Sequence, residues 1–249
     1  MSTLTPRQLA DKLARARCAV AFTGAGISTG AGIPDFRGPG GIYNSGRYDA
    51  ERVFDIDHFR HDPTEFYRFT RDMAETAGRV EPTFTHRFLA RLEEDGRLAG
   101  VVTQNIDPLH QQAGSCNVVS VHGSYATAHC LACGREFKYG QLLAMLDASP
   151  EVPRCGCPQR GVIKPDVVFF GEIVHAIDDA AELVGGSDLL LVLGSSLVVY
   201  PAAMLPELAP GEIVVVNRGE VAMAGGPGRW FIQADLDAYF RQVATAMAG

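Results

Sequence analysis

The fold is decided by the stretch AVAFTGAGISTGAG, residues 19–32, in which a short apolar run leads into a glycine-rich turn. Four apolar residues followed by such a turn are typical of a buried strand in a parallel sheet. Glycines there let backbone N–H groups approach a pyrophosphate, whose charge is favoured by the N-terminus of the helix expected next. The spacing G-x-G-x-x-x-G is one residue longer than the common dinucleotide motif, so a plain tight turn stays an alternative.

The residues after this turn do not fit a dehydrogenase. Pro34 leaves room for only a short helix, and residues 34–46 are rich in Gly and Pro, which indicates a long loop of the kind that is usually functional. A dehydrogenase carries a second strand that ends in an acid about 20 residues further on, where it holds the ribose of its cofactor. No such strand is predicted here, so the turn indicates a nucleotide site without indicating hydride transfer.

Apolar runs and helical patterns alternate along the rest of the chain. Strands are predicted at residues 101–103, 118–121, 167–170, 189–193, 213–216 and 231–232. Helices are predicted at residues 5–17, 64–77, 83–95, 175–185 and 235–247. Such alternation is typical of an α/β fold with a doubly wound parallel sheet. Residues 124–160 interrupt it with paired cysteines and few large apolar side chains, which predicts a small insert.

Length and composition fit one soluble globular enzyme. The 249 residues are near the upper limit for a single hydrophobic core, so we expect one domain with an insert. The formal net charge of −7 argues against general nucleic-acid binding, which needs clustered Lys and Arg. The first residues lack the pattern of a signal peptide, and no apolar run reaches the roughly 18 residues that span a membrane. We therefore expect a cytoplasmic protein without membrane contact, with a monomer as the default.

Four cysteines form two close pairs, which in a chain without a signal peptide favours a metal over disulfides. Cys130 and Cys133 have the C-x-x-C spacing of half a zinc site, whereas a single glycine separates Cys155 from Cys157. The glycine makes a tight bend feasible, and His129 is an alternative ligand. Four protein ligands leave no position for water, so we predict one structural Zn²⁺ per chain.

In six blocks, and in the same order, the chain resembles the sirtuin family. The blocks are GAGISTGAGIPDFRGPGGIY (24–43), TQNIDPLHQQAG (103–114), VHGS (121–124), KPDVVFFGE (164–172), GSSLVVYPA (194–202) and VVVN (214–217). The chain is most similar to bacterial and archaeal members that consist of the catalytic core alone. The resemblance implies a single catalytic domain over residues 1–249, with a Rossmann-like NAD-binding part at about 1–38, 84–123 and 161–249. The smaller inserted part then comprises about 39–83, which is helical, and 124–160, which binds zinc.

The resemblance implies an NAD-dependent protein-lysine deacetylase whose partners are acylated-lysine proteins. In the sirtuin reaction the amide oxygen of the acyl-lysine attacks C1′ of the nicotinamide ribose, and nicotinamide leaves. A ribose hydroxyl, activated by a base, then attacks the intermediate, so that free lysine and O-acetyl-ADP-ribose form. By resemblance the base is His122, and Asn105 and Asp107 hold the nicotinamide and the reacting ribose. An imidazole titrates near neutrality and suits this role, although a lone histidine is more often a surface or satisfied core residue.

The residues that resemble the family's NAD contacts follow predicted strands or lie in the long loop. They are Gly24, Ala25, Gly26, Ser28, Thr29, Asp35, Phe36, Arg37, Gln104, Asn105, Ile106, Asp107, His122, Gly194, Ser195, Ser196, Asn217 and Arg218. Phe36 is expected to shield C1′ from water, or alternatively only to anchor the loop. Arg37 is expected to pair with a phosphate.

A further set resembles the family's substrate contacts, in which a stretch of backbone pairs with the substrate peptide. These residues are Val168, Phe169, Phe170, Gly171, Glu172 and Val198. A plain buried strand explains the first of them equally well. Sirtuins that prefer succinyl-lysine or malonyl-lysine carry a Tyr and, three residues later, an Arg, whereas here Tyr67 is followed by Thr70 and only then by Arg71. Acetyl-lysine is therefore the expected substrate, with acidic and longer acyl groups left as alternatives.

Other activities fit the same motifs. Protein mono-ADP-ribosylation uses the same C1′ electrophile, and the sequence separates it poorly from deacylation. A non-catalytic module that senses NAD is expected to lack His122 or Asn105, and both are present. A zinc deacetylase that uses metal-bound water needs an open coordination position and His or Asp ligands, which the cysteine pairs do not offer.

Overall fold

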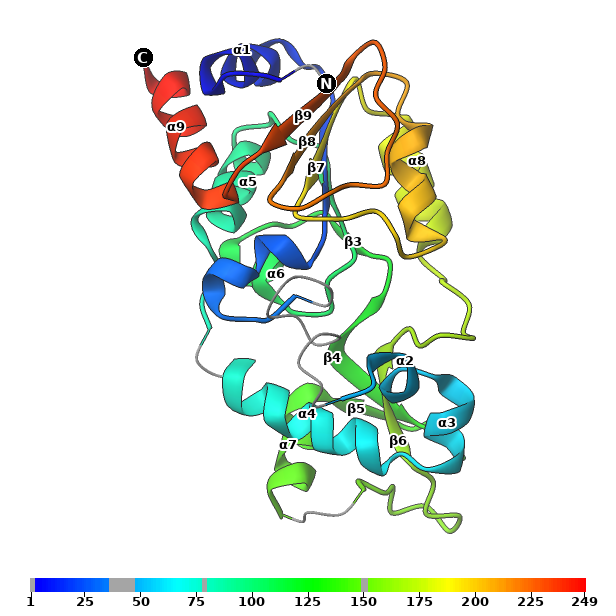
Figure 1. Ribbon diagram of the computed structural model, residues 1–249. Coiled ribbons are helices and arrows are strands. Elements are labelled where there is room, and N and C mark those ends of the chain that lie inside the picture. Colours follow the sequence, from blue (N-terminus) through cyan, green and yellow to red (C-terminus); the bar gives the residue numbers. More distant parts are fainter. Residues whose placement is uncertain (1–2, 36–47, 78–79, 149–151) are drawn as a thin grey trace.

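A parallel sheet of six strands forms the centre of the larger of two lobes (Figure 1). The computed structural model describes residues 3–35, 48–77, 80–148 and 152–249. The strands are β1 (Ala19–Thr23), β2 (Gly100–Thr103), β3 (Val118–Ser120), β7 (Leu189–Leu193), β8 (Glu212–Asn217) and β9 (Arg229–Gln233). In the order β3-β2-β1-β7-β8-β9 the sheet grows from β1 first in one direction and then in the other, as in a Rossmann fold. The predicted α/β fold with a doubly wound parallel sheet is confirmed.

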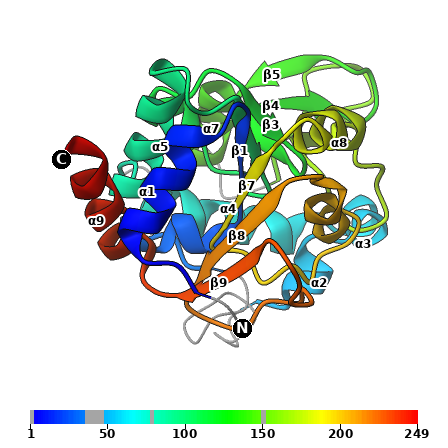
Figure 2. The same cartoon turned by 90° about the horizontal axis from the view of Figure 1, so that it is seen from above.

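Helices cover both faces of this sheet (Figure 2). One face carries α1 (Pro6–Arg15), α5 (Phe84–Glu94) with α6 (Leu109–Ala113) beside it, and α9 (Leu236–Ala248), and the other carries α8 (Ile177–Gly185) and the 3-10 helix η4 (Ala202–Leu208). The alternation along β1 explains both layers. Ala19 and Ala21 pack with α1, α5 and α9, whereas Val20 and Phe22 pack with α8 and η4. Because both faces are buried, the strands form continuous apolar runs in the sequence.

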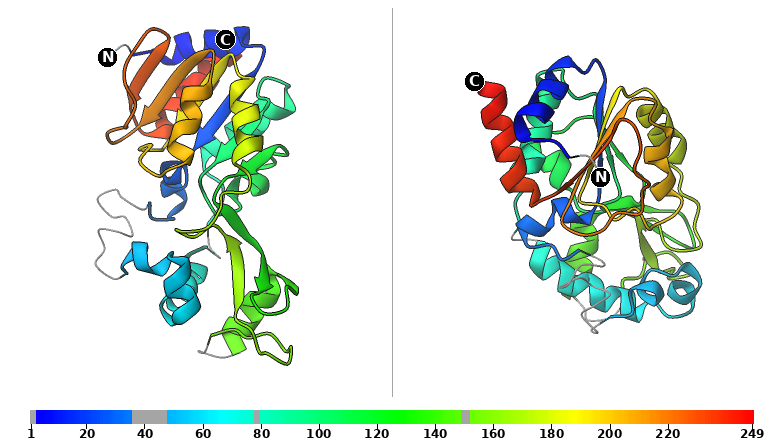
Figure 3. Two further views of the ribbon diagram at one scale, coloured as in Figure 1. Left: turned by 90° about the vertical axis from the view of Figure 1, so that its right-hand side faces the viewer. Right: turned by 45° about the horizontal axis from the view of Figure 1, so that its top comes forward.

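The smaller lobe combines segments that lie far apart in the sequence but side by side in space (Figure 3). Its antiparallel sheet has the order β5-β4-β6. The strands are β4 (Gly123–Cys130), β5 (Glu136–Lys138) and β6 (Ile163–Val167), and the helices are α2 (Ala50–Val53), α3 (Ile56–His61), α4 (Thr64–Ala77) and α7 (Tyr139–Ala148). Phe54, Phe59, Phe66 and Phe169 pack ring against ring, with the centroids of neighbouring rings 5.0 to 5.9 Å apart. This aromatic core joins the segments into one lobe.

The strand predicted for the parallel sheet at residues 167–170 is wrong. The strand found there is β6, which ends at Val167 and pairs antiparallel with β4 in the smaller sheet. The predicted division assigned the residues of β6 to the Rossmann-like part, whereas the structure places this strand in the smaller lobe. Two features distinguish β6 from the parallel strands: Pro165, which a sheet tolerates at its edge, and Lys164, which interrupts the apolar run.

The helix expected after the glycine-rich turn is replaced by two short 3-10 turns. They are η1 (Ala25–Ile27) and η2 (Thr29–Ala31). Gly32, with a φ of +96°, ends the second turn, and Pro34 follows closely. An α-helix N-terminus that could attract a pyrophosphate is therefore not formed at this turn. Of all helices in the described residues, none is both long and apolar enough to cross a membrane.

Candidate active site

A cleft of about 510 Å³ opens outside the carboxyl ends of β1 and β7. Doubly wound sheets bind their ligands at this edge, where the order of the strands reverses, and the volume lies in the usual range of ligand pockets. Most of the predicted site residues line this cleft. They are Gly24, Ala25, Gly26, Thr29, Asp35, Gln104, Asn105, Ile106, His122, Val168, Phe169, Phe170, Gly171, Glu172, Gly194, Ser195, Ser196, Asn217 and Arg218.

The other predicted residues do not contribute to the lining that the structure describes. Ser28 is fully buried, and it lies behind the cleft in contact with Asp107. Val198 is 40% exposed and lies outside the lining. Phe36 and Arg37 fall outside the described residues. The cleft therefore gathers residues from the ends of several strands, while the long loop adds only Asp35 among the described residues.

The first two glycines of the turn are needed because two strand ends approach each other closely. A Cβ on Gly24 would lie 2.8 Å from the carbonyl oxygen of Gly194, and one on Gly26 would lie 2.7 Å from Gly194 Cα. The amides of Gly24 and Gly26 donate to the carbonyls of Leu193 (3.0 Å) and Gly194 (2.9 Å). These two N–H groups thus already have partners within the protein. The close approach to Gly194 is thus a second reason for these glycines, and the approach of other backbone N–H groups of the turn to a pyrophosphate stays a prediction.

Asn105 is oriented by two side chains behind it. Its Nδ2 donates to Ser28 Oγ at 3.1 Å, and Ser28 Oγ donates in turn to Asp107 Oδ2 at 2.9 Å. Asp107 Oδ1 also accepts the amide of Leu109 at 3.0 Å. Burial raises the pKa of Asp107, and the hydrogen bonds from Leu109 and Ser28 oppose that rise. Asp107 therefore acts on the cleft through Ser28, and the carboxamide of Asn105 has a fixed orientation.

His122 lines the cleft with a defined tautomer. Its Nδ1 lies 2.8 Å from the carbonyl oxygen of Gln104. Because a carbonyl can only accept, the neutral ring carries its proton on Nδ1 and keeps its lone pair on Nε2. Burial lowers the pKa of His122, and the hydrogen bond to Gln104 offsets part of that effect. The ring is therefore neutral at pH 7 and can accept a proton.

The chain turns sharply directly after His122. Gly123 has a φ of +70°, and a Cβ there would lie 1.9 Å from the carbonyl oxygen of Asp166. Only glycine satisfies both restrictions. The amide of Val168, in the segment that follows β6, donates to the carbonyl of His122 at 2.9 Å. His122 is thus held where the larger lobe meets the smaller one.

Two buried histidines lie behind the same strand ends. Thr23 Oγ1 donates to Thr103 Oγ1 at 2.9 Å, and Thr103 Oγ1 also accepts the amide of Asn105 at 3.0 Å. Since Thr23 has donated its only hydroxyl proton, His110 Nε2, which is 2.9 Å away, donates to Thr23. The ring of His86 packs against that of His110, with the centroids 4.6 Å apart. Neutral His110 therefore supports the backbone of Asn105 through two threonines.

This histidine pair predicts a loss of stability in mild acid. Burial lowers the pKa of His86 to about 4 and that of His110 to about 3, against about 6.5 in the unfolded chain. As the pH falls below 6.5, the unfolded state binds protons that the folded state does not, so stability is lost progressively toward the folded pKa values. Each histidine is expected to lower the free energy of unfolding at pH 5 by about 2 kcal/mol relative to pH 7.5. Urea unfolding at the two pH values measures this loss.

The exposed His61 supplies the matched control for that measurement. His61→Asn is expected to leave the difference in unfolding free energy between pH 7.5 and pH 5 unchanged. His86→Asn removes one buried titrating ring and is expected to reduce the difference by about 2 kcal/mol. A difference that stays the same in His86→Asn would show that this histidine does not gain its proton on unfolding.

The four paired cysteines converge at one end of the smaller lobe, with all sulfur atoms within 4.8 Å of one another. Two Sγ–Sγ distances are 3.9 Å, between Cys130 and Cys157, and 3.8 Å, between Cys133 and Cys155. A tetrahedral zinc with Zn–S bonds of about 2.3 Å places its sulfurs about 3.8 Å apart. The four side chains therefore fit a structural Zn²⁺ despite the short second pair.

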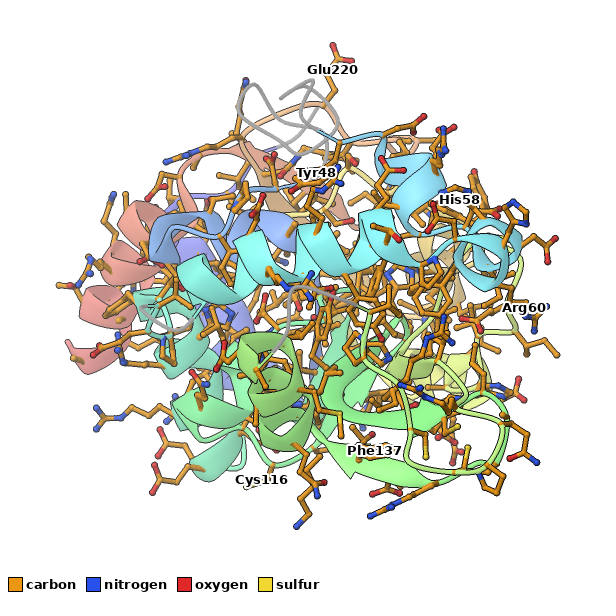
Figure 4. All side chains as sticks on the ribbon, turned by 90° about the horizontal axis from the view of Figure 1, so that it is seen from below. Tyr48, His58, Arg60, Cys116, Phe137 and Glu220 are labelled. Atoms are coloured by element: carbon orange, nitrogen blue, oxygen red, sulfur yellow. The ribbon has the colours of Figure 1, made fainter. Side chains whose placement is uncertain are left out.

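His129 is directed away from this group. Its Nδ1 lies 2.5 Å from Asp166 Oδ1, and the hydroxyl of Thr127 donates to the other carboxylate oxygen. His129 is thus committed to Asp166, and the geometry does not support it as a replacement ligand. Cys116 lies at the periphery of the molecule (Figure 4), and Cys18 is partly buried. Neither belongs to the group of four.

The side chains considered for acidic acyl groups have other contacts. Tyr67 is fully buried in the core of the smaller lobe, and its hydroxyl donates to the carbonyl of Ile163. Arg71 Nη1 donates to the carbonyl of Tyr67 at 3.4 Å. Neither residue is part of the cleft lining that the structure describes. Packing of the smaller lobe therefore explains Tyr67 without any acyl group.

Sequence reasoning missed residues at one end of the cleft, among them Glu220 and Asp235. Asp235 pairs with Arg218 at 2.5 Å, and its other carboxylate oxygen caps the first turn of α9. It follows the carboxyl end of β9, so the rule that selected Asn217 at the carboxyl end of β8 also selects Asp235. No comparable signal identifies Glu220, which lies in an irregular stretch.

Comparisons with known proteins agree with this geometry. The model of the Sir2 family matches residues 24–201. The NAD-dependent protein deacetylase of Thermotoga maritima is 44% identical over 220 residues, covering 86% of this chain and 87% of the relative. The NAD-dependent protein deacetylase of Sulfolobus acidocaldarius is 40% identical over 217 residues, covering 86% of this chain and 84% of the relative.

Solved structures show the same similarity over nearly the whole chain. One described as "Sir2-p53 peptide-NAD+" has a TM-score of 0.87 at 39% identity. Another, described as "Sir2 bound to acetylated peptide", has a TM-score of 0.86 at 37% identity. Each similarity covers 97% of this chain and 98% of the other.

Proposed function

Since this chain belongs to the Sir2 family, the sirtuins, we propose that it is an NAD-dependent protein-lysine deacetylase. It transfers the acetyl group of an acetylated lysine to ADP-ribose and releases nicotinamide and O-acetyl-ADP-ribose. The observation that carries the proposal is the state of His122. Its partly buried ring is neutral, its Nδ1 is fixed by Gln104, and it lines a cleft at the edge where doubly wound sheets bind nucleotides.

The cleft offers separate groups for the two ends of NAD, which supplies an electrophilic ribose carbon with nicotinamide as its leaving group. We assign Asn217 and Arg218, at the carboxyl end of β8, to the adenosine end. Asn105, whose carboxamide is held by the side chains behind it, is assigned to the nicotinamide end. Gln104 Nε2 donates to Ser195 Oγ at 2.7 Å, and this hydrogen bond connects the segments that follow β2 and β7. The other predicted NAD contacts in the lining are also assigned to NAD, because they belong to the same cleft.

His122 is assigned as the base for a ribose hydroxyl. With Nδ1 donating to Gln104, Nε2 is the atom that accepts the hydroxyl proton. Because burial lowers the pKa of His122, the ring stays in its basic form throughout the neutral range. Activity is therefore expected to fall only on the acid side of neutrality.

The segment that follows β6 is assigned to the acylated peptide. Phe170 is 43% exposed at the cleft. Its amide donates to the carbonyl of Phe54 at 2.7 Å, and its carbonyl accepts the amide of Ile56 at 3.1 Å. A peptide strand that adds to this segment needs backbone groups without such partners. We therefore expect it to pair with the carbonyl of Val168 and the amide of Gly171.

The remaining assignments follow from the smaller lobe and the composition. Acetyl-lysine is the proposed substrate, because Tyr67 is committed to the core and offers no partner for an acidic acyl group. The larger lobe is proposed as the NAD-binding part and the smaller lobe as the helical and zinc-binding part, with one structural Zn²⁺. Closely spaced thiols fit a reducing compartment, so we propose a cytoplasmic enzyme. We propose a monomer as the default oligomeric state. The net charge of −7 gives no support for nucleic acid as a partner.

The test is a comparison of acylated peptides with and without NAD. Acetyl-, succinyl- and myristoyl-lysine versions of one peptide are incubated with the protein, and the peptide mass is followed. We expect the acetyl peptide to lose its acyl group fastest, and only when NAD is present. Deacetylation without NAD would contradict the proposal. Transfer of radiolabel from NAD to protein, with no deacylation of any peptide, would instead support the ADP-ribosyltransferase alternative.

A further inference from the structure

A lysine is buried between the smaller sheet and the cleft. The side chain of Lys164, on β6, is 3% exposed. Its Nζ donates to the carbonyl of Val167 at 2.7 Å and lies 2.8 Å from Glu172 Oε2. The same atom lies 4.1 Å from the centroid of the Phe169 ring. An ammonium group is buried at such a position only when its contacts replace the lost water, so these contacts have a defined geometry.

Glu172 closes the turn that follows β6. Its Oε2 accepts the amide of Phe169 at 2.8 Å, and its own amide donates to the carbonyl of Phe169 at 3.0 Å. Oε2 therefore receives two donors, one from Lys164 and one from the backbone of the turn. The ion pair thus fixes the beginning and the end of residues 167–172.

The segment that this pair fixes is the wall of the cleft assigned to the peptide. Its residues line the cleft, and the amide of Val168 donates to the carbonyl of His122 at 2.9 Å. We propose that Lys164 and Glu172 are positioning residues that hold this wall in register with the acylated peptide. The proposal rests on the proposed deacetylase function and assigns to Lys164, the first residue of the block at 164–172, a role that the sequence alone does not specify.

Stability alone does not account for such a pair. Buried ion pairs contribute little net stability compared with apolar side chains of similar volume, because both charges lose their hydration. A methionine at position 164 would fill the same space without that penalty. What the ion pair adds is direction, since Nζ and Oε2 set where the carbonyl of Val167 and the amide of Phe169 point.

Among the described residues, the hydrogen bonds, the ion pair and the ring contact of the two side chains all lie within residues 164–172, so their loss should weaken peptide binding more than NAD binding. The variants are Lys164→Met, Glu172→Gln, which keeps an acceptor for the Phe169 amide, and the double variant. Lys138→Met, at an exposed lysine on β5, is the control. Binding of a fluorescent acetyl-lysine peptide is measured by anisotropy, and binding of NAD by calorimetry. Thermal unfolding is recorded for each protein.

We expect Lys164→Met and Glu172→Gln each to weaken peptide binding about tenfold, as for the loss of one charge-assisted hydrogen bond, with NAD binding changed less than about twofold. The double variant should bind the peptide at least as tightly as the single variant that binds it less well, because neither charge is left unpaired. In turnover the KM for the peptide should rise while the KM for NAD stays the same. A merely structural role would lower the folded fraction and kcat without this split between the two KM values.

Two negative results are distinguishable. If the wild-type protein neither binds the acetyl peptide nor deacetylates it with NAD, the proposed function itself fails. If the wild-type protein is active and Glu172→Gln or the double variant binds the peptide within about twofold of wild type, the positioning role is overturned. The result holds even if Lys164→Met does not fold, since Glu172→Gln changes the charge and not the volume.

Discussion

Replacing His122 with alanine is expected to lower kcat for deacetylation by about 10²- to 10⁴-fold, the usual contribution of a general base. The fold should tolerate the change, because the ring contributes one hydrogen bond to Gln104 and lines the cleft. The base acts after nicotinamide has left, so the first step does not need it. Exchange of labelled nicotinamide into NAD, in the presence of the acetyl peptide, should therefore persist in His122→Ala while deacetylated peptide no longer accumulates.

Nicotinamide exchange and peptide deacetylation are measured on the same preparation. His61→Ala removes an exposed histidine and should leave both rates unchanged. The wild-type rate of deacetylation should fall as the pH drops below the ordinary histidine value near 6.5, because burial lowers the pKa of His122 and the basic form is lost only in acid. Full deacetylase activity in His122→Ala would contradict the assignment of the base.

Removal of zinc is expected to unfold the smaller lobe and abolish activity. Cys130 is the last residue of β4, and Cys155 and Cys157 lie in the stretch that leads to β6, so the metal would link the end of β4 to the stretch before β6. Structural zinc contributes about 10 to 16 kcal/mol of apparent binding free energy at pH 7, more than the net stability of a typical domain. Purified protein should contain about one zinc per chain. Cys155→Ser, or a strong chelator, should lower the unfolding temperature sharply and expose the aromatic core.

Metal analysis and thermal unfolding followed by near-UV circular dichroism check this result. Cys116→Ser is the matched control, because Cys116 lies outside the group of four sulfurs. It should bind zinc and unfold like the wild-type protein. Purified protein without zinc, or an unchanged unfolding temperature in Cys155→Ser, would rule out the structural metal while leaving the NAD chemistry untouched.

The parallel sheet and much of the cleft could be predicted from the sequence because strands buried on both faces form continuous apolar runs. In β1 every residue is buried, and the glycine-rich turn marks where it ends. Side chains that follow such strands meet at one edge of the sheet, which is why Asn105, Ser195 and Asn217 were placed correctly in the lining. The group of four cysteines could also be predicted from the sequence, since the spacing of the thiolates depends on short local loops.

What the sequence did not reveal depends on contacts between distant segments. The apolar residues after Lys164 have the pattern of a parallel strand, but β6 pairs with β4 because both belong to the smaller lobe. The glycines at 24 and 26 have a packing partner, Gly194, that lies far along the chain. Local sequence patterns also do not predict the contacts of the Lys164 side chain. The same holds for the hydrogen bonds that run from Asn105 through Ser28, because both depend on the tertiary structure.

The fate of the acetyl group tests the proposed chemistry most directly. A single turnover with acetyl-lysine peptide, NAD and excess enzyme is quenched, and the products are separated and identified by mass. Transfer to a ribose hydroxyl activated by His122 predicts nicotinamide, free-lysine peptide and O-acetyl-ADP-ribose in equal amounts. Free acetate in place of O-acetyl-ADP-ribose, the product of direct hydrolysis by activated water, would contradict it.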